Sequence, residues 1–242
     1  MTKQLEIRES DTLAGSVHPR LAKKLVGHKK AWDTFLNCKE NGKLHHAWII
    51  SGPKGIGKAT FSWKIAANLI CDTRETGSME KLIPSLSDLF LCRKNFDEKT
   101  NRLKKNITIN EIRKLKSFFQ MSATECQWRI VIIDCADELN KSASNALLKI
   151  LEEPPRKSIF LIVANQPERL SVTIRSRCRT LNLNKLTINE VKQVLENSNY
   201  DLETLSPNDK NILSILAEGS PGLAITAINY EGINDFKKCL EI

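Results

Sequence analysis

Residues 47–60 read AWIISGPKGIGKAT, and this stretch determines the architecture of the chain. Its first four residues are an apolar run typical of a buried strand, and they lead directly into the phosphate-loop pattern G-x-x-x-x-G-K. Gly52, Gly55, Gly57 and Lys58 supply the fixed positions of that pattern. Backbone N–H groups of such a turn surround an anion at the start of a helix, and the lysine adds positive charge. The stretch therefore predicts a strand, a phosphate-binding loop and a helix, in that order.

The pattern departs from the active form at its last position. Ala59 stands where a serine or threonine hydroxyl would hold Mg²⁺. Thr60 lies one position too late to replace that hydroxyl directly, although it remains a candidate residue of the cleft. The phosphate cradle is thus intact while one metal ligand is missing, so the sequence leaves nucleotide binding open.

A second apolar run, residues 130–133, ends in Asp134, an acid that would reach a metal beside the phosphate loop. Cys135 follows where an ATPase would place a catalytic glutamate. A thiol is a weak hydrogen-bond acceptor and mostly neutral near pH 7, so it does not polarise an attacking water as a carboxylate does. Asp137 and Glu138 lie past the end of the strand and are expected to point elsewhere. The alternative is a buried strand that merely ends in an aspartate.

Short apolar runs alternate with helical stretches along the first three quarters of the chain, which predicts an α/β fold with a five-stranded parallel sheet covered on both faces. The runs are residues 47–50, 88–92, 130–134, 159–164 and 180–183. After about Lys185 the strand signals stop, and helical patterns follow at 187–197, 207–217 and 221–229. We therefore expect a core domain over residues 1–184 and a small all-helical domain over residues 185–242. The polar stretches 71–84 and 93–105 are expected to be surface loops.

Composition narrows the class of protein. Lys and Arg outnumber Asp and Glu by 37 to 28, a net charge of +9 that favours a polyanion such as nucleic acid, with ordinary solubility charge as the alternative. The seven cysteines are an odd number with no C-x-x-C pair, so neither disulfides nor a metal site are expected. No apolar run is long enough for a membrane span and no signal peptide is evident, so we expect a cytoplasmic protein with no membrane contact.

A third group of motifs identifies a family. Residues 145–155 read NALLKILEEPP, residues 162–165 read IVAN, and Ser176-Arg177-Cys178 follows. Together with the phosphate loop, they resemble the clamp-loader branch of the AAA+ ATPases, found in bacterial DNA polymerase III. The resemblance runs from about Val17 to Ala227. It implies a P-loop NTPase core of five parallel strands, a small helical lid and usually a third, collar domain through which subunits form a ring. Because little sequence remains after the lid, the collar is expected to be missing or truncated.

The resemblance also implies roles for single residues. Arg177 would be an arginine finger that reaches into the ATP site of a neighbouring subunit, where a planar guanidinium stabilises negative charge on phosphoryl oxygens. Asn165 would match the polar residue that senses the γ-phosphate. A second sensing arginine would fall at Gly222, and this position does not match. The alternative for Arg177 is an ordinary surface arginine.

Ala59, Cys135 and Gly222 depart together from the pattern of the hydrolysing subunits. The resemblance therefore implies a subunit that is not an ATPase by itself and acts inside the DNA-directed DNA polymerase III complex. The implied role requires no cofactor, and binding of ATP with Mg²⁺ stays open. The expected partners form a hetero-oligomeric ring with the ATPase (gamma/tau) and delta subunits, together with the sliding clamp and the phosphate backbone of primed DNA.

Two other functions fit part of the sequence. The first is an active clamp-loader ATPase in which Thr60 and either Asp137 or Glu138 compensate for the altered positions. The second is a basic nucleic-acid-binding module that uses an inherited fold, which would bind DNA tightly and in a salt-dependent manner without partner subunits.

Overall fold

The computed structural model describes residues 9, 12–13, 15–22, 24–71, 88–120 and 128–240. Within them a five-stranded sheet has the order β2-β5-β6-β1-β7, and every pairing is parallel. The strands are β1 (Ala47–Ser51), β2 (Leu89–Cys92), β5 (Arg129–Ile133), β6 (Ser158–Ala164) and β7 (Arg179–Asn182). Each predicted strand is found, with ends that differ by at most one residue. The α/β prediction is thus confirmed.

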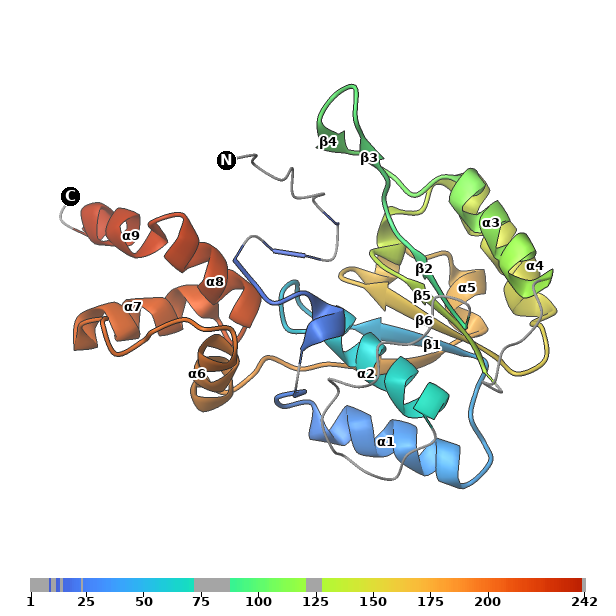
Figure 1. The fold of residues 1–242 in the computed structure, drawn as a ribbon, viewed down its shortest axis with the longest axis horizontal. Coiled ribbons are helices and arrows are strands. Elements are labelled where there is room, and N and C mark those ends of the chain that lie inside the picture. Colours follow the sequence, from blue (N-terminus) through green and yellow to red (C-terminus); the bar gives the residue numbers. More distant parts are fainter. Residues whose placement is uncertain are drawn as a thin grey trace, which may run out of the picture.

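Helices cover both faces of the sheet (Figure 1). On one face lie α1 (Lys29–Glu40) and α2 (Lys58–Cys71), and on the other lie α3 (Ile109–Gln120), α4 (Lys141–Glu152) and α5 (Val172–Ser176). Short 3₁₀ turns connect these elements at η1 (Pro19–Leu21), η3 (Ala136–Glu138) and η4 (Pro167–Arg169). This arrangement places the carboxyl ends of the strands at one edge, where ligands bind in open α/β sheets.

Successive side chains of the central strands point to opposite faces of the sheet, and this alternation divides the core into two layers. In β6, Phe160 and Ile162 pack toward α3 and α4, whereas Ile159 and Leu161 pack toward α1 and α2. Successive side chains of a strand point to opposite faces, so an unbroken apolar run is what a doubly covered strand requires. All seven residues of β6 are buried.

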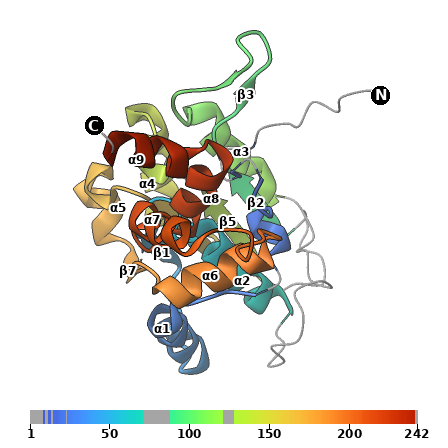
Figure 2. The same cartoon turned by 90° about the vertical axis from the view of Figure 1, so that its left-hand side faces the viewer.

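The C-terminal part of the described chain is helical: α6 (Ile188–Asn197), α7 (Pro207–Ala217), α8 (Pro221–Asn229) and α9 (Gly232–Leu240). These helices share an apolar cluster of their own, built around Leu195, Leu213 and Ile225. They lie beside the carboxyl edge of the sheet (Figures 1 and 2). The sequence predicted three of them, and α9 is an addition. Among the described helices, none combines the length and apolar character needed to cross a membrane.

One predicted loop contains regular structure. Residues 93–105 hold an antiparallel hairpin, β3 (Phe96–Asp97) and β4 (Arg102–Leu103), with Asn101 in the left-handed conformation at the end of its turn. Strands of two residues leave no alternating pattern, so the sequence indicated the surface position of this segment but not its strand pairing. Most of the other predicted loop, residues 71–84, falls outside the described residues.

Candidate phosphate site

The phosphate loop lies between β1 and α2, as its sequence predicts. Gly52, Gly55 and Gly57 all have positive φ, at 147°, 80° and 98°. A Cβ on Gly52 would lie 2.4 Å from the carbonyl oxygen of Leu183, so no other residue fits there without a shift of the backbone. The glycines thus set the path of the loop into the N-terminus of α2, where free N–H groups favour an anion.

Lys58 opens α2, and its ammonium donates to two carbonyl oxygens of the loop, those of Gly52 at 2.8 Å and Pro53 at 2.6 Å. Its side chain is buried, and burial lowers the pKa of Lys58 to about 8. The opposing effect comes from nearby acidic groups, which raise the pKa of Lys58: those of Cys135, Asp137 and Asp134. Lys58 is therefore a positive group held inside the loop at neutral pH.

The acid predicted to bind a metal lies at the end of β5, beside Lys58 in the same cleft. Asp134 is only 4% exposed. The thiol of Cys135 donates to Oδ2 of Asp134 at 3.5 Å, and Cys135 itself takes a left-handed conformation at the strand end. Burial raises the pKa of Cys135 far above the ordinary range of a thiol. At this position the chain therefore has a neutral hydrogen-bond donor rather than a base.

Asn165 follows β6, and its side-chain nitrogen lies 4.0 Å from the sulfur of Cys135. Its backbone N–H donates to Oδ1 of Asp137 at 3.1 Å. The 3₁₀ turn after β5 therefore directs Asp137 to the backbone that follows β6, and Asp137 is not among the residues that line the cleft described below. Glu138 forms an ion pair with Lys94 at 2.6 Å.

These residues meet in one cleft of about 710 Å³. Of the predicted site residues, Gly55, Gly57, Lys58, Thr60, Asp134 and Asn165 line it. Gly52 lies behind them as the turn of the loop. The remaining walls come mainly from the N-terminal segment before α1, from α6 with the residues just after it, and from α8. Such a volume is within the usual range for a small-molecule site.

The C-terminal helices contact the phosphate loop directly. The N–H of Gly222 donates to the carbonyl oxygen of Gly55 at 2.9 Å, and Oγ of Ser220 donates to that of Lys54 at 2.9 Å. A Cβ on Gly222 would lie 2.7 Å from the Cα of Gly55. The absence of a side chain at position 222 is therefore what allows α8 to approach the loop this closely.

The donor set fits a phosphate group better than it fits Mg²⁺. Backbone groups of the glycine loop, the start of α2 and Lys58 are suited to an anion. For the metal, Asp134 is present but receives the thiol hydrogen bond from Cys135, and Ala59 offers no hydroxyl. When bound, a nucleotide would lie on the loop beside Lys58.

Arg177 lies outside this cleft. It follows α5, where Nη2 lies 2.9 Å from Oε1 of Glu152 and Nη1 donates to the carbonyl oxygen of Thr173 at 3.1 Å. The Arg177 side chain is 36% exposed and that of Glu152 is 50% exposed. The guanidinium is thus oriented by two partners at the surface, and it is not among the residues that line the chain's own cleft.

Sequence reasoning missed His28 and Ser220. Nε2 of His28 donates to the carbonyl oxygen of Ile56 at 2.8 Å, which fastens the start of α1 to the phosphate loop. Burial lowers the pKa of His28, so the ring is neutral at physiological pH. The contacts of His28 with Ile56 and of Ser220 with Lys54 join segments that are far apart in the chain, so no local sequence pattern could reveal them.

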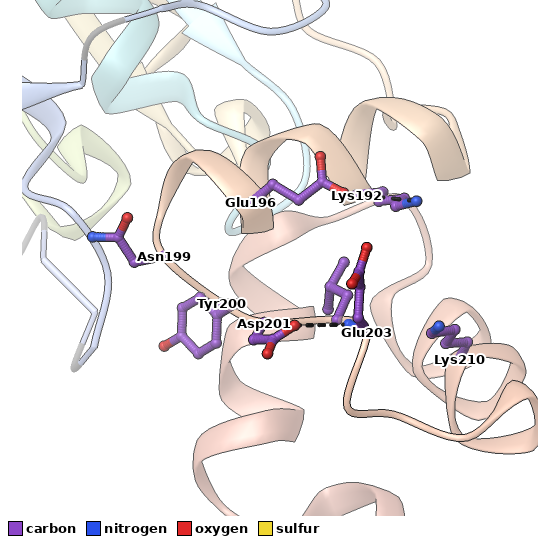
Figure 3. Close-up of a pocket in the computed structure, with 8 residues that line it drawn as sticks. Lys192, Glu196, Asn199, Tyr200, Asp201, Glu203 and Lys210 are labelled. Atoms are coloured by element: carbon purple, nitrogen blue, oxygen red, sulfur yellow. Dashed lines mark hydrogen bonds and ion pairs between the residues drawn. The ribbon is translucent and has the colours of Figure 1, made fainter.

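A second hollow, of about 490 Å³, lies on the C-terminal helices where α6 turns toward α7 (Figure 3). Its lining mixes charges of both signs: Lys192, Glu196, Asn199, Tyr200, Asp201, Leu202, Glu203 and Lys210. Several of these groups interact with one another, as in the ion pair of Lys192 with Glu196 and the hydrogen bond from the N–H of Glu203 to Asp201. It has no anion cradle, so the cleft at the phosphate loop remains the candidate site.

Comparison with known proteins gives one matching family model. It is described as DNA polymerase III, delta subunit, and it matches residues 27–187. Relatives at similar identity carry different subunit names. The chain is 30% identical over 227 residues to DNA polymerase III subunit gamma of Buchnera aphidicola subsp. Schizaphis graminum, covering 90% of this chain and 60% of that protein.

Two further relatives show the range of subunit names. The tau subunit of Escherichia coli is 29% identical over 213 residues, covering 86% of this chain and 32% of that protein. The delta' subunit of Pseudomonas aeruginosa is 33% identical over 157 residues, covering 61% of this chain and 46% of that protein. The chain therefore spans between about a third and 60% of the length of these relatives.

Solved structures support the fold. The RuvB Holliday junction branch migration motor of Thermotoga maritima matches with a TM-score of 0.57 and 16% identity, covering 86% of this chain and 63% of that one. A gamma subunit-related protein of the same organism matches with a TM-score of 0.50 and 21% identity, covering 78% of this chain and 68% of that one.

Proposed function

The chain belongs to the DNA polymerase III delta-subunit family, and on this basis we propose that it is a clamp-loader subunit of the delta prime type, which does not turn over ATP itself. The observation that carries the proposal is Cys135. Its neutral thiol donates to Asp134 at the position where hydrolysis needs a carboxylate base. Ala59 and Gly222 support the same conclusion, since each removes a further group that the active subunits use.

In this proposal the chain acts on a neighbour's nucleotide through Arg177. The guanidinium is partly exposed, is oriented by Glu152 and Thr173, and lies away from the chain's own cleft. A planar fork with several donors suits the oxygens of a phosphoryl group whose negative charge grows in the transition state. Arg177 would thus complete a catalytic site that the partner ATPase cannot complete alone.

The proposed partners follow from this role. The ATPase (gamma/tau) subunit would receive Arg177, the delta subunit would complete a hetero-oligomeric ring, and the ring would place a sliding clamp on primed DNA. The core would be residues 1–184 and the lid residues 185–242. Neither Mg²⁺ nor ATP bound to this chain is needed for Arg177 to act.

Complex formation tests the proposal. We expect the 242-residue chain, mixed with the gamma-type ATPase and delta subunits of its own organism, to elute as one complex of fixed stoichiometry in size-exclusion chromatography with light scattering. Arg177→Ala should assemble equally well, since a partly exposed ion pair contributes at most about 1 kcal/mol. Failure to assemble in the presence of ATP and of both partners would contradict the proposed role.

A second candidate is an active clamp-loader ATPase. It is favoured by the names of the relatives that cover most of the chain, since the gamma and tau subunits above cover 90% and 86% of it. In that case Asp137, which accepts from the backbone N–H of Asn165, would compensate for Cys135, and Thr60 would compensate for Ala59. Hydrolysis by the isolated chain separates the two candidates.

A further inference from the structure

The phosphate loop has a run of backbone donors that the rest of the described chain does not use. The N–H groups of Lys54, Gly55 and residues 57–60 donate to no described residue, and all six of these residues line the cleft. The first backbone hydrogen bond of α2 comes from Phe61, which donates to the carbonyl oxygen of Gly57 at 2.9 Å. A helix start leaves about four N–H groups unpaired, and the loop adds others to them. A group with several acceptor oxygens, such as a phosphate, matches this run.

Lys58 adds a cation to these donors. Three lysines line the cleft, Lys24, Lys54 and Lys58, and of these only Lys58 is buried. Its ammonium donates to the carbonyl oxygens of Gly52 and Pro53, which hold it at the loop. An ammonium has three donors, so one remains for an oxygen of a ligand.

The cleft also presents apolar surface that the chain leaves uncovered. Val17 is 38% exposed and Leu21 is 50% exposed, although both line the cleft. Both belong to the N-terminal segment before α1, and the side chains of Leu13, Leu25 and Val26 from the same segment line the cleft beside them. A phosphate ion would leave this surface in water, whereas the base of a nucleotide would cover it. The lining therefore suits a ligand with both an anionic part and an apolar part.

The same lining is poorly suited to Mg²⁺, which requires several oxygen ligands in octahedral geometry. Ala59 presents a methyl group, and Oδ2 of Asp134 accepts from the thiol of Cys135 at 3.5 Å. Thr60 lies one position further along α2, so its side chain leaves the helix about 100° away from that of Ala59. Without a metal, each added phosphate brings negative charge into a cleft that already contains the buried carboxylate of Asp134.

We propose that this cleft binds a nucleoside diphosphate without a metal ion. The unpaired N–H groups and Lys58 would receive the phosphates, and Val17 and Leu21 would be covered by the base. A third phosphate would gain no metal to neutralise it. This inference goes beyond the proposed function, which needs no nucleotide on this chain, because Arg177 lies outside the cleft.

Isothermal titration calorimetry of the 242-residue chain with ADP tests this directly. We expect ADP to bind in EDTA, and its Kd to change by less than about threefold when Mg²⁺ replaces EDTA. ATP in EDTA should bind no more tightly than ADP. No binding of ADP at about 1 mM, or a Kd that Mg²⁺ lowers by about tenfold or more, would overturn the inference.

Lys58→Ala should weaken ADP binding in EDTA by about tenfold or more, because a charged donor to the phosphates is lost. Lys29→Ala is the matched control, since it removes one positive charge from an exposed position at the start of α1, outside the cleft. ADP should raise the unfolding temperature of wild type and of Lys29→Ala, but not that of Lys58→Ala. Equal affinity of all three proteins for ADP would overturn the inference.

Inorganic pyrophosphate separates a nucleotide site from an anion site. It presents two phosphate groups without a base, so it should bind about tenfold or more weakly than ADP. Leu21→Ala should weaken ADP binding by about threefold and leave pyrophosphate binding unchanged, because less apolar surface meets the base. Equal affinity of wild type for ADP and pyrophosphate would overturn the nucleotide assignment.

Ala59→Thr tests the reason given for metal independence. This variant supplies the hydroxyl that a phosphate loop uses to hold Mg²⁺, so Mg²⁺ should tighten its binding of ATP by about tenfold or more, and that of wild type much less. If Mg²⁺ affects both proteins alike, the inference is overturned. A chain that binds no ADP but assembles into the loader would overturn this inference alone. A chain that binds ADP without Mg²⁺ but fails to assemble would count against the proposed function alone.

Discussion

Arg177→Ala is expected to slow ATP hydrolysis at the adjoining site of a reconstituted loader by roughly 10³-fold or more, the range found where an arginine finger is removed. The loss arises because the guanidinium meets the transferring phosphoryl group only as negative charge develops on it. Single-turnover hydrolysis by the loader, with DNA and sliding clamp present, measures this step. The fold of the chain should not change, since Arg177 has only its partly exposed contacts with Glu152 and Thr173 to lose.

Two controls make the result specific. Arg175→Ala removes an exposed positive charge two residues away and should leave the rate nearly unchanged. Arg177→Lys keeps the charge but loses the planar fork, so it should recover only a small part of the activity. If Arg177→Ala and Arg175→Ala behave alike, Arg177 is an ordinary surface arginine.

Gly222→Ala is expected to lower the free energy of unfolding by about 1–3 kcal/mol, the usual cost of overpacking. The new Cβ would lie 2.7 Å from the Cα of Gly55 and 3.1 Å from its carbonyl oxygen, and backbone atoms cannot rotate away as a flexible side chain can. The better helix propensity of alanine, about 1 kcal/mol, offsets only part of this cost. Urea denaturation of both chains measures the difference.

Leu223→Ala supplies the control on the same helix. Leu223 is 42% exposed, so its truncation should cost less than about 1 kcal/mol. If Gly222→Ala is as stable as wild type, the close contact of α8 with the phosphate loop does not hold in solution. Close packing against Gly55 would then not be the reason why position 222 has no side chain.

Much of the fold could be predicted because its signals are local. The predicted strands that correspond to β1, β5 and β6 are unbroken apolar runs, and Pro207 and Pro221 mark the first residues of two C-terminal helices. Three features escaped. The strands β3 and β4 are too short to show a period. The helix α9 went unpredicted although Ile233, Phe236 and Leu240 recur at helical spacing. Asp137 turns back toward the backbone of Asn165 through a 3₁₀ turn that no sequence pattern predicts.

The candidate site also combines features that have local sequence signals with features that have none. The phosphate-loop glycines, Lys58 and Asp134 follow from spacing along the chain, and the structure places Lys58 and Asp134 in one cleft. The contacts of Gly222 with Gly55 and of His28 with Ile56 depend on how distant segments approach each other. The sequence predicted only a polar surface loop over residues 93–105, and the pairing of β3 with β4 within it became evident from the structure.

The proposed function requires that this chain does not hydrolyse ATP and instead serves a neighbour's site. Steady-state hydrolysis by the isolated 242-residue chain with ATP and Mg²⁺, measured beside Lys58→Ala, addresses that requirement without any partner subunit. We expect no multiple turnover by the wild-type chain and no difference between the two proteins. Steady turnover over many cycles that Lys58→Ala abolishes would contradict the proposed function.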